Sequence, residues 1–131
     1  MNSDLQDKKK RWYDIGLRFA LNGLKEAIKT ERNMKVHMAA TVLVILLAIS
    51  LEVTIIEWTI LLLTIAMVIG MELMNTALEH ALDYLAPERT KEIKAAKDIA
   101  ASSVLVVSIM ACIIGFMLFF PKIMDLFKSI L

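Results

Sequence analysis

A long uncharged run near the carboxyl end of the chain limits the folds open to this sequence. From Ile99 to Phe120 no side chain carries a charge, and the run matches the about 20 residues that a helix needs to cross a bilayer. Because the run is apolar around the whole circumference of a helix, it favours burial in lipid. The alternative, a soluble helical bundle, would leave much of this surface in water.

Two further apolar segments raise the expected number of membrane helices to three. Val36–Leu51 contains no Asp, Glu, Lys or Arg, whereas Trp58–Met71 reaches spanning length only if its helix continues through Glu72 and Glu79. With 58% hydrophobic residues in 131, the chain is more apolar than an ordinary soluble domain. We predict an all-α integral membrane protein with one domain over residues 1–131 and transmembrane helices at 34–56, 58–85 and 98–120.

The basic residues are unevenly distributed along the chain. They cluster at 8–11 before the first apolar segment and again at 89–97 between the second and third, whereas the first connection holds Glu52 and Glu57 and no base. By the positive-inside rule, the N-terminus and the second connection lie in the cytoplasm and the C-terminus lies outside.

The two ends of the chain carry different patterns. Residues 1–11 predict a flexible polar tail. Residues 12–30 form an amphipathic pattern with a basic stripe, typical of a helix lying in the membrane interface; packing on a partner protein is the alternative. Pro121 is expected to end the third span, leaving residues 121–131 as an outer tail.

The chain beyond Thr30 can be interpreted in two ways. If the helix continues, Glu31 lies on its apolar side, where the carboxylate needs a cation or a metal as partner. Alternatively, Thr30 caps a new helix that starts near Glu31.

Four polar residues recur along the second span. Glu72, Asn75, Glu79 and Asp83 are spaced three, four and four residues apart, which places them on one stripe of a helix. Acidic residues at membrane depth are costly and by default mark a functional site. Hydrogen bonding between helices is the alternative, and it explains a lone Asn75 better than the whole stripe.

The residue types on the stripe indicate phosphoryl transfer. Carboxylates with a carboxamide suit Mg²⁺, a poorly solvated carboxylate suits general-base work, and Lys97 could meet phosphate oxygens. The four glycines, at 16, 23, 70 and 115, form neither a Walker A loop nor a Rossmann fingerprint. Any nucleotide site must therefore be built from helical side chains. His37 and His80 are interpreted as polar residues at helix boundaries rather than as ligands.

Three stretches together resemble one known family. They are Glu72-Leu-Met-Asn75-Thr-Ala-Leu-Glu79 with Asp83 following, Lys94-Ala-Ala-Lys97-Asp98-Ile-Ala-Ala, and Gly23-Leu-Lys-Glu-Ala-Ile-Lys-Thr-Glu31-Arg-Asn33-Met-Lys35. Over about residues 12–120 the chain resembles the prokaryotic diacylglycerol kinase family of small integral-membrane lipid kinases. The resemblance implies an interfacial N-terminal helix, three transmembrane helices and a homotrimeric helical bundle with active sites shared between subunits. It also implies transfer of the ATP γ-phosphate to a lipid hydroxyl at the cytoplasmic face of the bacterial inner (cytoplasmic) membrane, with no nucleic-acid partner.

The resemblance also implies roles for individual residues. Glu72 would be the catalytic base and Asn75 would orient the reacting groups. Glu31 and Glu79 would hold the Mg²⁺ that chelates ATP. The nucleotide-binding residues would be Glu31, Glu79, Glu88, Arg89, Thr90, Lys97 and Asp98. Lys35 would lie near the lipid substrate together with Glu72.

The segment from Thr30 to His37 bears on the choice of substrate. With Asn33 and His37, this segment looks like the undecaprenol kinase branch, because the diacylglycerol branch has an acidic residue where this chain has His37. We therefore expect phosphorylation of undecaprenol to undecaprenyl phosphate. The alternatives are a diacylglycerol kinase making phosphatidic acid, a non-enzymatic membrane protein such as a channel or assembly factor, and a lipid-binding module.

Overall fold

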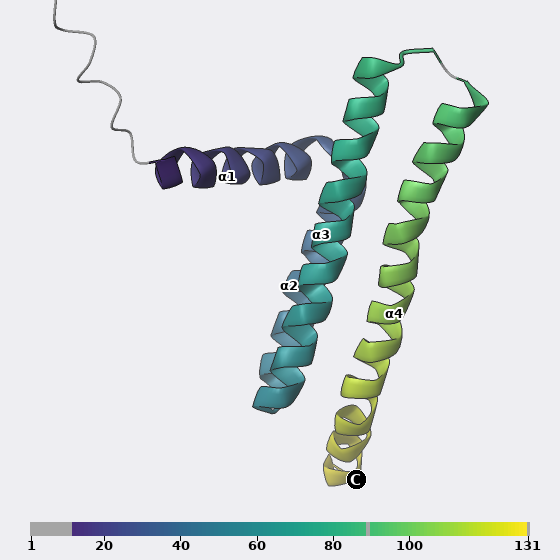
Figure 1. Ribbon diagram of the computed structural model, residues 1–131. Coiled ribbons are helices and arrows are strands. Elements are labelled where there is room, and N and C mark those ends of the chain that lie inside the picture. Colours follow the sequence, from purple (N-terminus) through teal and green to yellow (C-terminus); the bar gives the residue numbers. More distant parts are fainter. Residues whose placement is uncertain (1–11, 89, 131) are drawn as a thin grey trace, which may run out of the picture.

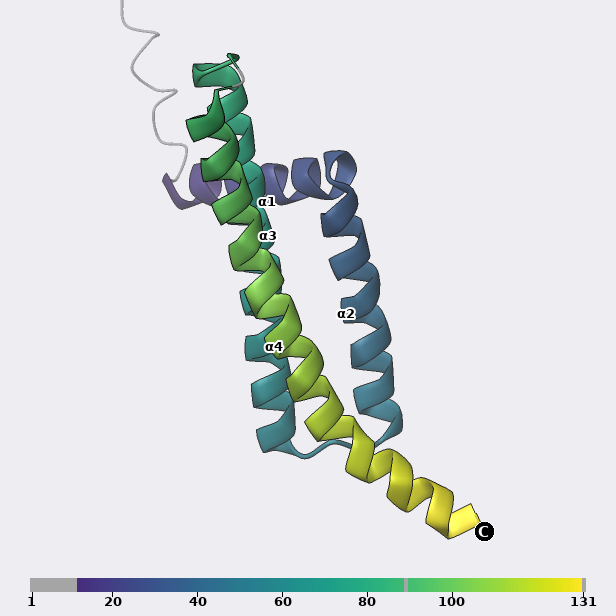
Figure 2. The same cartoon turned by 90° about the vertical axis from the view of Figure 1, so that its right-hand side faces the viewer.

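The chain forms four α-helices over the residues that the structure describes. The computed structural model describes residues 12–88 and 90–130, so the predicted tail at 1–11 lies outside the described residues. The helices are α1 (Trp12–Thr30), α2 (Arg32–Ser50), α3 (Ile55–Leu85) and α4 (Lys91–Ile130). α1 runs across the direction of the other three, which lie lengthwise beside one another (Figures 1 and 2). Helices α2, α3 and α4 are long and apolar enough to cross a membrane, which confirms the predicted number of three.

The break between α1 and α2 falls at Glu31. This residue has an extended backbone, with φ −89° and ψ 126°, and it occupies the N-cap position of α2. The Thr30 hydroxyl donates to the Glu26 carbonyl at 3.0 Å, so Thr30 does not cap α2. The chain therefore turns at Glu31. Because Glu31 lies between the two helices, its carboxylate belongs neither to the apolar face of α1 nor to its basic stripe.

The turn between α2 and α3 comes earlier than predicted. The sequence suggested one span to residue 56 and another from 58, but α2 ends at Ser50 and α3 begins at Ile55. A capping box sets this start: the Thr54 backbone N–H donates to Glu57 Oε2 at 2.6 Å, and the Glu57 N–H donates to Thr54 Oγ1 at 3.3 Å. These bonds satisfy backbone donors that the first turn of a helix otherwise leaves unpaired.

The expectation that Pro121 ends the third long helix is wrong. α4 continues through Pro121 to Ile130, and its C-terminal part extends past the adjacent ends of α2 and α3 (Figure 2). A proline inside a helix removes one backbone hydrogen bond and crowds the preceding turn. The next residue contacts another helix: Lys122 Nζ lies 3.1 Å from Glu57 Oε2 and ties this segment to the start of α3.

The helices pack loosely, with α3 most extensively against α4 and less so against α2. An apolar core lies near the α2–α3 turn and comprises Ala48, Val53, Leu61 and Phe119. Large apolar side chains on α2, α3 and α4 are exposed over much of the single chain, as expected for helices that face lipid or a further subunit. Against that background, the buried polar residues of α3 are Glu72, Asn75 and Thr76.

Candidate active site

Glu72 and Asn75 open into one small cavity between three helices. Glu72 is only 2% exposed and Asn75 only 8%. The cavity has a volume of about 220 Å³ and is completed by Asn33 of α2 and by Ala101, Val104, Leu105 and Ser108 of α4. We call it the polar cavity. The two residues proposed as catalytic therefore lie side by side, both buried, in the wall of one cavity.

The polar cavity contains hydrogen-bond acceptors that are not used. Asn75 Nδ2 donates to Glu79 Oε1 at 3.1 Å, one helical turn further on. Asn75 Oδ1 and Glu72 Oε2 are buried and have no hydrogen-bond partner among the described residues. The His37 imidazole approaches this carboxylate, with Nε2 4.0 Å from Glu72 Oε2, which is too long for a hydrogen bond. Buried acceptors of this kind are costly to leave unpaired, so the cavity is suited to a ligand that brings a donor.

Further carboxylates gather around Glu72. Glu31 Oε1 lies 3.4 Å from His80 Nε2 of α3. The corner between α1 and α2 therefore lies beside the part of α3 that carries Glu79. Glu31 and Glu79 both lie close enough to Glu72 for their charges to act on its carboxylate. The polar stripe of α3 thus gains a carboxylate from a second element.

The donor set around Glu31 and Glu79 fits a magnesium ion that arrives with a nucleotide. Magnesium is usually held by one or two carboxylates together with substrate phosphates, and it seldom uses a complete protein cage. In the part of the chain that the structure describes, no group of three or more His, Cys, Asp and Glu residues is placed to hold a metal. Glu79 is oriented by Asn75, and Glu31 comes from the corner between α1 and α2, where it lies beside His80 of α3. The two carboxylates are therefore suited to complete the coordination of a metal–nucleotide complex.

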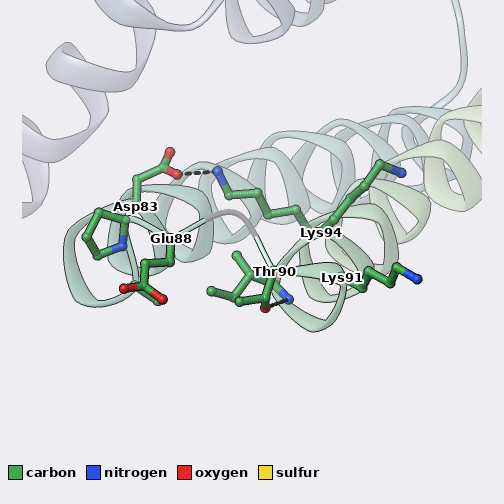
Figure 3. Close-up of a pocket in the computed structure, with 9 residues that line it drawn as sticks. Asp83, Glu88, Thr90, Lys91 and Lys94 are labelled. Atoms are coloured by element: carbon green, nitrogen blue, oxygen red, sulfur yellow. Dashed lines mark hydrogen bonds and ion pairs between the residues drawn. The ribbon is translucent and has the colours of Figure 1, made fainter.

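A second cavity lies at the connection between α3 and α4. It has a volume of about 550 Å³ and is lined by Asp83, Ala86, Pro87, Glu88, Thr90, Lys91, Ile93, Lys94 and Lys97. We call it the turn cavity. Figure 3 shows Asp83 and Glu88 on one side of it, Lys91 and Lys94 on the other, and Thr90 between them. Lys97 Nζ forms an ion pair with Asp83, which ties the end of α3 to the start of α4.

The structure brings some of the predicted nucleotide residues together and separates others. Glu88, Thr90 and Lys97 all line the turn cavity, whereas Arg89 lies outside the described residues. Asp98 pairs with Lys94 Nζ at 2.8 Å, and its link to the turn cavity is through that lysine. Lys35, the proposed lipid-side residue, is exposed in the first turn of α2.

An apolar cavity adjoins the polar one. It has a volume of about 320 Å³, and its lining includes His37 and Thr41 of α2, Leu61 and Val68 of α3, and Ser108 and Cys112 of α4. We call it the apolar cavity. Ser108 lines both cavities, and His37 approaches Glu72. The polar and apolar cavities are therefore neighbours that share Ser108 in their walls.

Sequence reasoning missed Ser108 and the carboxylate contacts of His37 and His80. His37 and His80 were interpreted as polar residues at helix boundaries, but each lies beside a carboxylate, Glu72 and Glu31 respectively. Ser108 was not singled out, although it is the one hydroxyl-bearing residue between 104 and 120. This isolated hydroxyl was the signal by which Ser108 could have been found in the sequence. The contacts of the two histidines depend on how neighbouring helices face each other, which no pattern within one helix reveals.

Three membrane-length helices, a buried carboxylate beside an apolar cavity and a lysine-lined second cavity form the arrangement expected of an integral-membrane lipid kinase. The comparisons with known proteins agree. The model of a family described as "Prokaryotic diacylglycerol kinase" matches residues 18–119, and the chain belongs to this family of lipid kinases.

Curated relatives of the chain include lipid kinases of two named kinds. An undecaprenol kinase of Bacillus subtilis is 42% identical over 101 residues, covering 77% of this chain and 82% of the relative. A diacylglycerol kinase of Synechocystis is 37% identical over 113 residues, covering 86% of this chain and 65% of the relative. A diacylglycerol kinase of Haemophilus influenzae is 31% identical over 98 residues, covering 75% of this chain and 80% of the relative. The class of enzyme is thus established by relatives that differ in their lipid.

Proposed function

We propose that this protein transfers the γ-phosphate of MgATP to the hydroxyl of undecaprenol and releases undecaprenyl phosphate. The observation that carries the proposal is the buried Glu72, whose Oε2 has no hydrogen-bond partner in the described chain. An acceptor held in this way can receive the proton of an alcohol. The similarity to an undecaprenol kinase supports undecaprenol as the substrate, as does His37 at the position beside Glu72.

The chemical step needs a base and an aligned hydroxyl. The hydroxyl oxygen forms a bond to the γ-phosphorus while the bond from that phosphorus to the β,γ-bridging oxygen breaks, and ADP leaves with the electron pair. Glu72 accepts the hydroxyl proton as the oxygen attacks. Little covalent chemistry is required of the protein beyond this, so positioning and charge stabilisation provide most of the catalysis. Asn75, with its free Oδ1 in the same cavity, orients the reacting groups.

Glu31 and Glu79 would hold the magnesium ion that ATP brings. When bound, the ion neutralises phosphate charge and supplies a fixed point for the triphosphate. Asn75 contributes to this by holding Glu79 Oε1 at 3.1 Å, which fixes one carboxylate oxygen and leaves the other to the ligand.

The nucleotide would extend from the turn cavity toward the polar cavity. Asp83 and Glu72 are eleven residues apart on α3, which corresponds to about 16 Å along the helix axis. The base and ribose would occupy the turn cavity with Glu88, Arg89 and Thr90, and Lys97 would meet the phosphates as they pass toward Glu72. Asp98 would contribute through its pair with Lys94. An extended nucleoside triphosphate has the length for this path.

The placement in the membrane follows from the charges. The lysine-rich start of α4 favours a cytoplasmic location for the turn cavity, so the N-terminus and active site would face the cytoplasm of a bacterial cell. α1 would lie in the interface, and Lys35 beside it would meet the lipid headgroup region. A homotrimer with shared active sites would cover part of the exposed apolar surface of α2, α3 and α4.

The proposal is tested by a two-lipid assay. Purified protein in mixed micelles is given MgATP with either undecaprenol or a diacylglycerol, and phosphorylated lipid is measured, with omission of Mg²⁺ as the control. We expect product from undecaprenol at a kcat/KM at least tenfold above that for diacylglycerol, and no product without Mg²⁺. Efficient turnover of diacylglycerol with no product from undecaprenol would favour the second candidate, which the two diacylglycerol kinase relatives support.

A further inference from the structure

Ser108 differs from the other serines of α4 in how its hydroxyl is used. Serines inside helices usually bond to a backbone carbonyl three or four residues earlier. Ser102 does so with Asp98 at 2.7 Å, Ser103 with Ala100 at 2.6 Å and Ser129 with Leu126 at 2.7 Å. Ser108 Oγ is buried and has no partner among the described residues. Its hydroxyl is therefore available to form a hydrogen bond with a ligand inside the bundle.

The position of Ser108 gives that hydroxyl a specific environment. Ser108 lines the polar cavity together with Glu72 and Asn75, and it lines the apolar cavity together with His37. The unpaired oxygens of Glu72 and Asn75 can only accept hydrogen bonds, whereas a serine hydroxyl can also donate one. Ser108 thus adds a buried hydroxyl donor to the lining that holds the unpaired oxygens of Glu72 and Asn75.

These groups complement an alcohol. A bound hydroxyl has one proton to donate and lone pairs that accept. Glu72 Oε2 and His37 Nε2 are 4.0 Å apart, and a hydroxyl oxygen placed beside their connecting line can lie about 2.8 Å from each. With its proton directed at Glu72, such an oxygen still has a lone pair to be satisfied, and Ser108 lines both the cavity of Glu72 and the cavity of His37.

The adjoining apolar cavity suits the carbon chain that follows the hydroxyl. It shares Ser108 with the lining of the polar cavity, and its remaining lining is predominantly aliphatic. The occupant that fits both cavities at once is a molecule with a hydroxyl at the end of an apolar chain, which is the acceptor substrate itself.

We propose that Ser108 binds the acceptor substrate by donating a hydrogen bond to the oxygen of its hydroxyl, at the junction of the polar and apolar cavities. This inference rests on the proposed function, because it requires a lipid alcohol at Glu72. Ser108 holds the oxygen so that its proton faces Glu72, and it leaves MgATP binding to the other residues.

The test compares two substitutions at Ser108 with a matched control on the same helix. Ser108→Ala removes the hydroxyl, and Ser108→Cys replaces it with a weak donor of similar volume. Ser103→Ala removes a hydroxyl that is already bonded to its own helix. Initial rates are measured in mixed micelles with undecaprenol and with MgATP varied separately, and thermal unfolding is recorded for each variant.

Loss of one hydrogen bond to the acceptor should lower kcat/KM for the lipid by about five- to tenfold. Both Ser108 variants should show this loss, with KM for MgATP within twofold of the parental protein and with Ser103→Ala at parental rates. Parental rates in Ser108→Ala would overturn the inference. So would loss in Ser108→Ala but not in Ser108→Cys, since that would indicate packing, and so would an equal rise in KM for MgATP. Failure of the proposed function looks different: the parental protein itself would make no product from undecaprenol.

Discussion

The polar cavity and the turn cavity differ in how their polar groups are satisfied. In the polar cavity, Glu72 and Asn75 are buried and retain unpaired oxygens. At the turn cavity, Asp83 pairs with Lys97 and Lys94 pairs with Asp98, and both acidic side chains are largely exposed. One region holds polar groups at a cost to stability; the other holds them in solvent-accessible ion pairs that contribute little.

This difference suits the two cavities to different parts of the proposed reaction. A solvated, lysine-rich cavity can exchange its ion pairs for phosphate contacts at little cost, which suits reversible nucleotide binding. A buried carboxylate with an open acceptor is poorly suited to binding an anion but well suited to taking a proton from a neutral hydroxyl. Substitutions in the two regions should therefore alter different kinetic constants.

The largest expected effect comes from the polar cavity. Glu72→Gln keeps the shape of the side chain and removes its ability to take a proton, so kcat for lipid phosphorylation should fall by about a thousandfold, within the range typical of a lost general base. Steady-state assays in mixed micelles measure it. Glu52→Gln, an exposed substitution at the α2–α3 turn, is the control and should remain at parental rates. A Glu72→Gln protein with parental kcat would remove Glu72 from the role of base.

A smaller effect of a different kind is expected at the turn cavity. Lys97→Ala removes a cation that we place on the ATP phosphates, so KM for MgATP should rise about tenfold or more, the cost of one lost charge-assisted hydrogen bond. KM for the lipid should change by less than twofold. Lys128→Ala is the control, because Lys128 is an exposed cation near the far end of α4 that pairs with Asp125 at 3.7 Å. An unchanged KM for MgATP in Lys97→Ala would place the nucleotide elsewhere.

The smallest effect should come from a third region that belongs to neither cavity. Thr54→Ala breaks the capping box of α3, and the free energy of unfolding should fall by about 1 kcal/mol while kcat and both KM values stay unchanged. Denaturant titration in micelles measures it. Thr59→Ala, one turn later, removes a hydroxyl that bonds only to its own helix at Ile55 and should cost less. Equal losses in both variants would show that the cap contributes nothing of its own.

The sequence predicted features that depend on one helix at a time. The spacing of Glu72, Asn75 and Glu79 placed them on one face of α3, and the structure joins Asn75 to Glu79 across one turn. Apolar length predicted the three long helices correctly. The turn before α3 was misplaced although Thr54 and Glu57 carry the signature of a capping box, so this error was avoidable.

Features that depend on two helices could not be predicted in the same way. The approach of His37 to Glu72 and the position of Ser108 at two cavities depend on the rotation and register of α2 and α4 against α3, which no periodicity within a single helix encodes. The contact between Lys122 and Glu57 just beyond Pro121 is similar, because it joins residues far apart in the chain. The sequence thus indicated which residues are chemically competent, and packing determined which of them meet.

The central claim is that Glu72 acts in the chemical step and that MgATP is bound by other residues. The most direct measurement is the dissociation constant of MgATP for Glu72→Gln in micelles containing undecaprenol, with lipid phosphate assayed in the same sample. We predict a dissociation constant within about threefold of the parental protein, equivalent to less than about 0.7 kcal/mol, and almost no lipid phosphate. Loss of MgATP binding in step with loss of product, or undiminished product, would contradict this account.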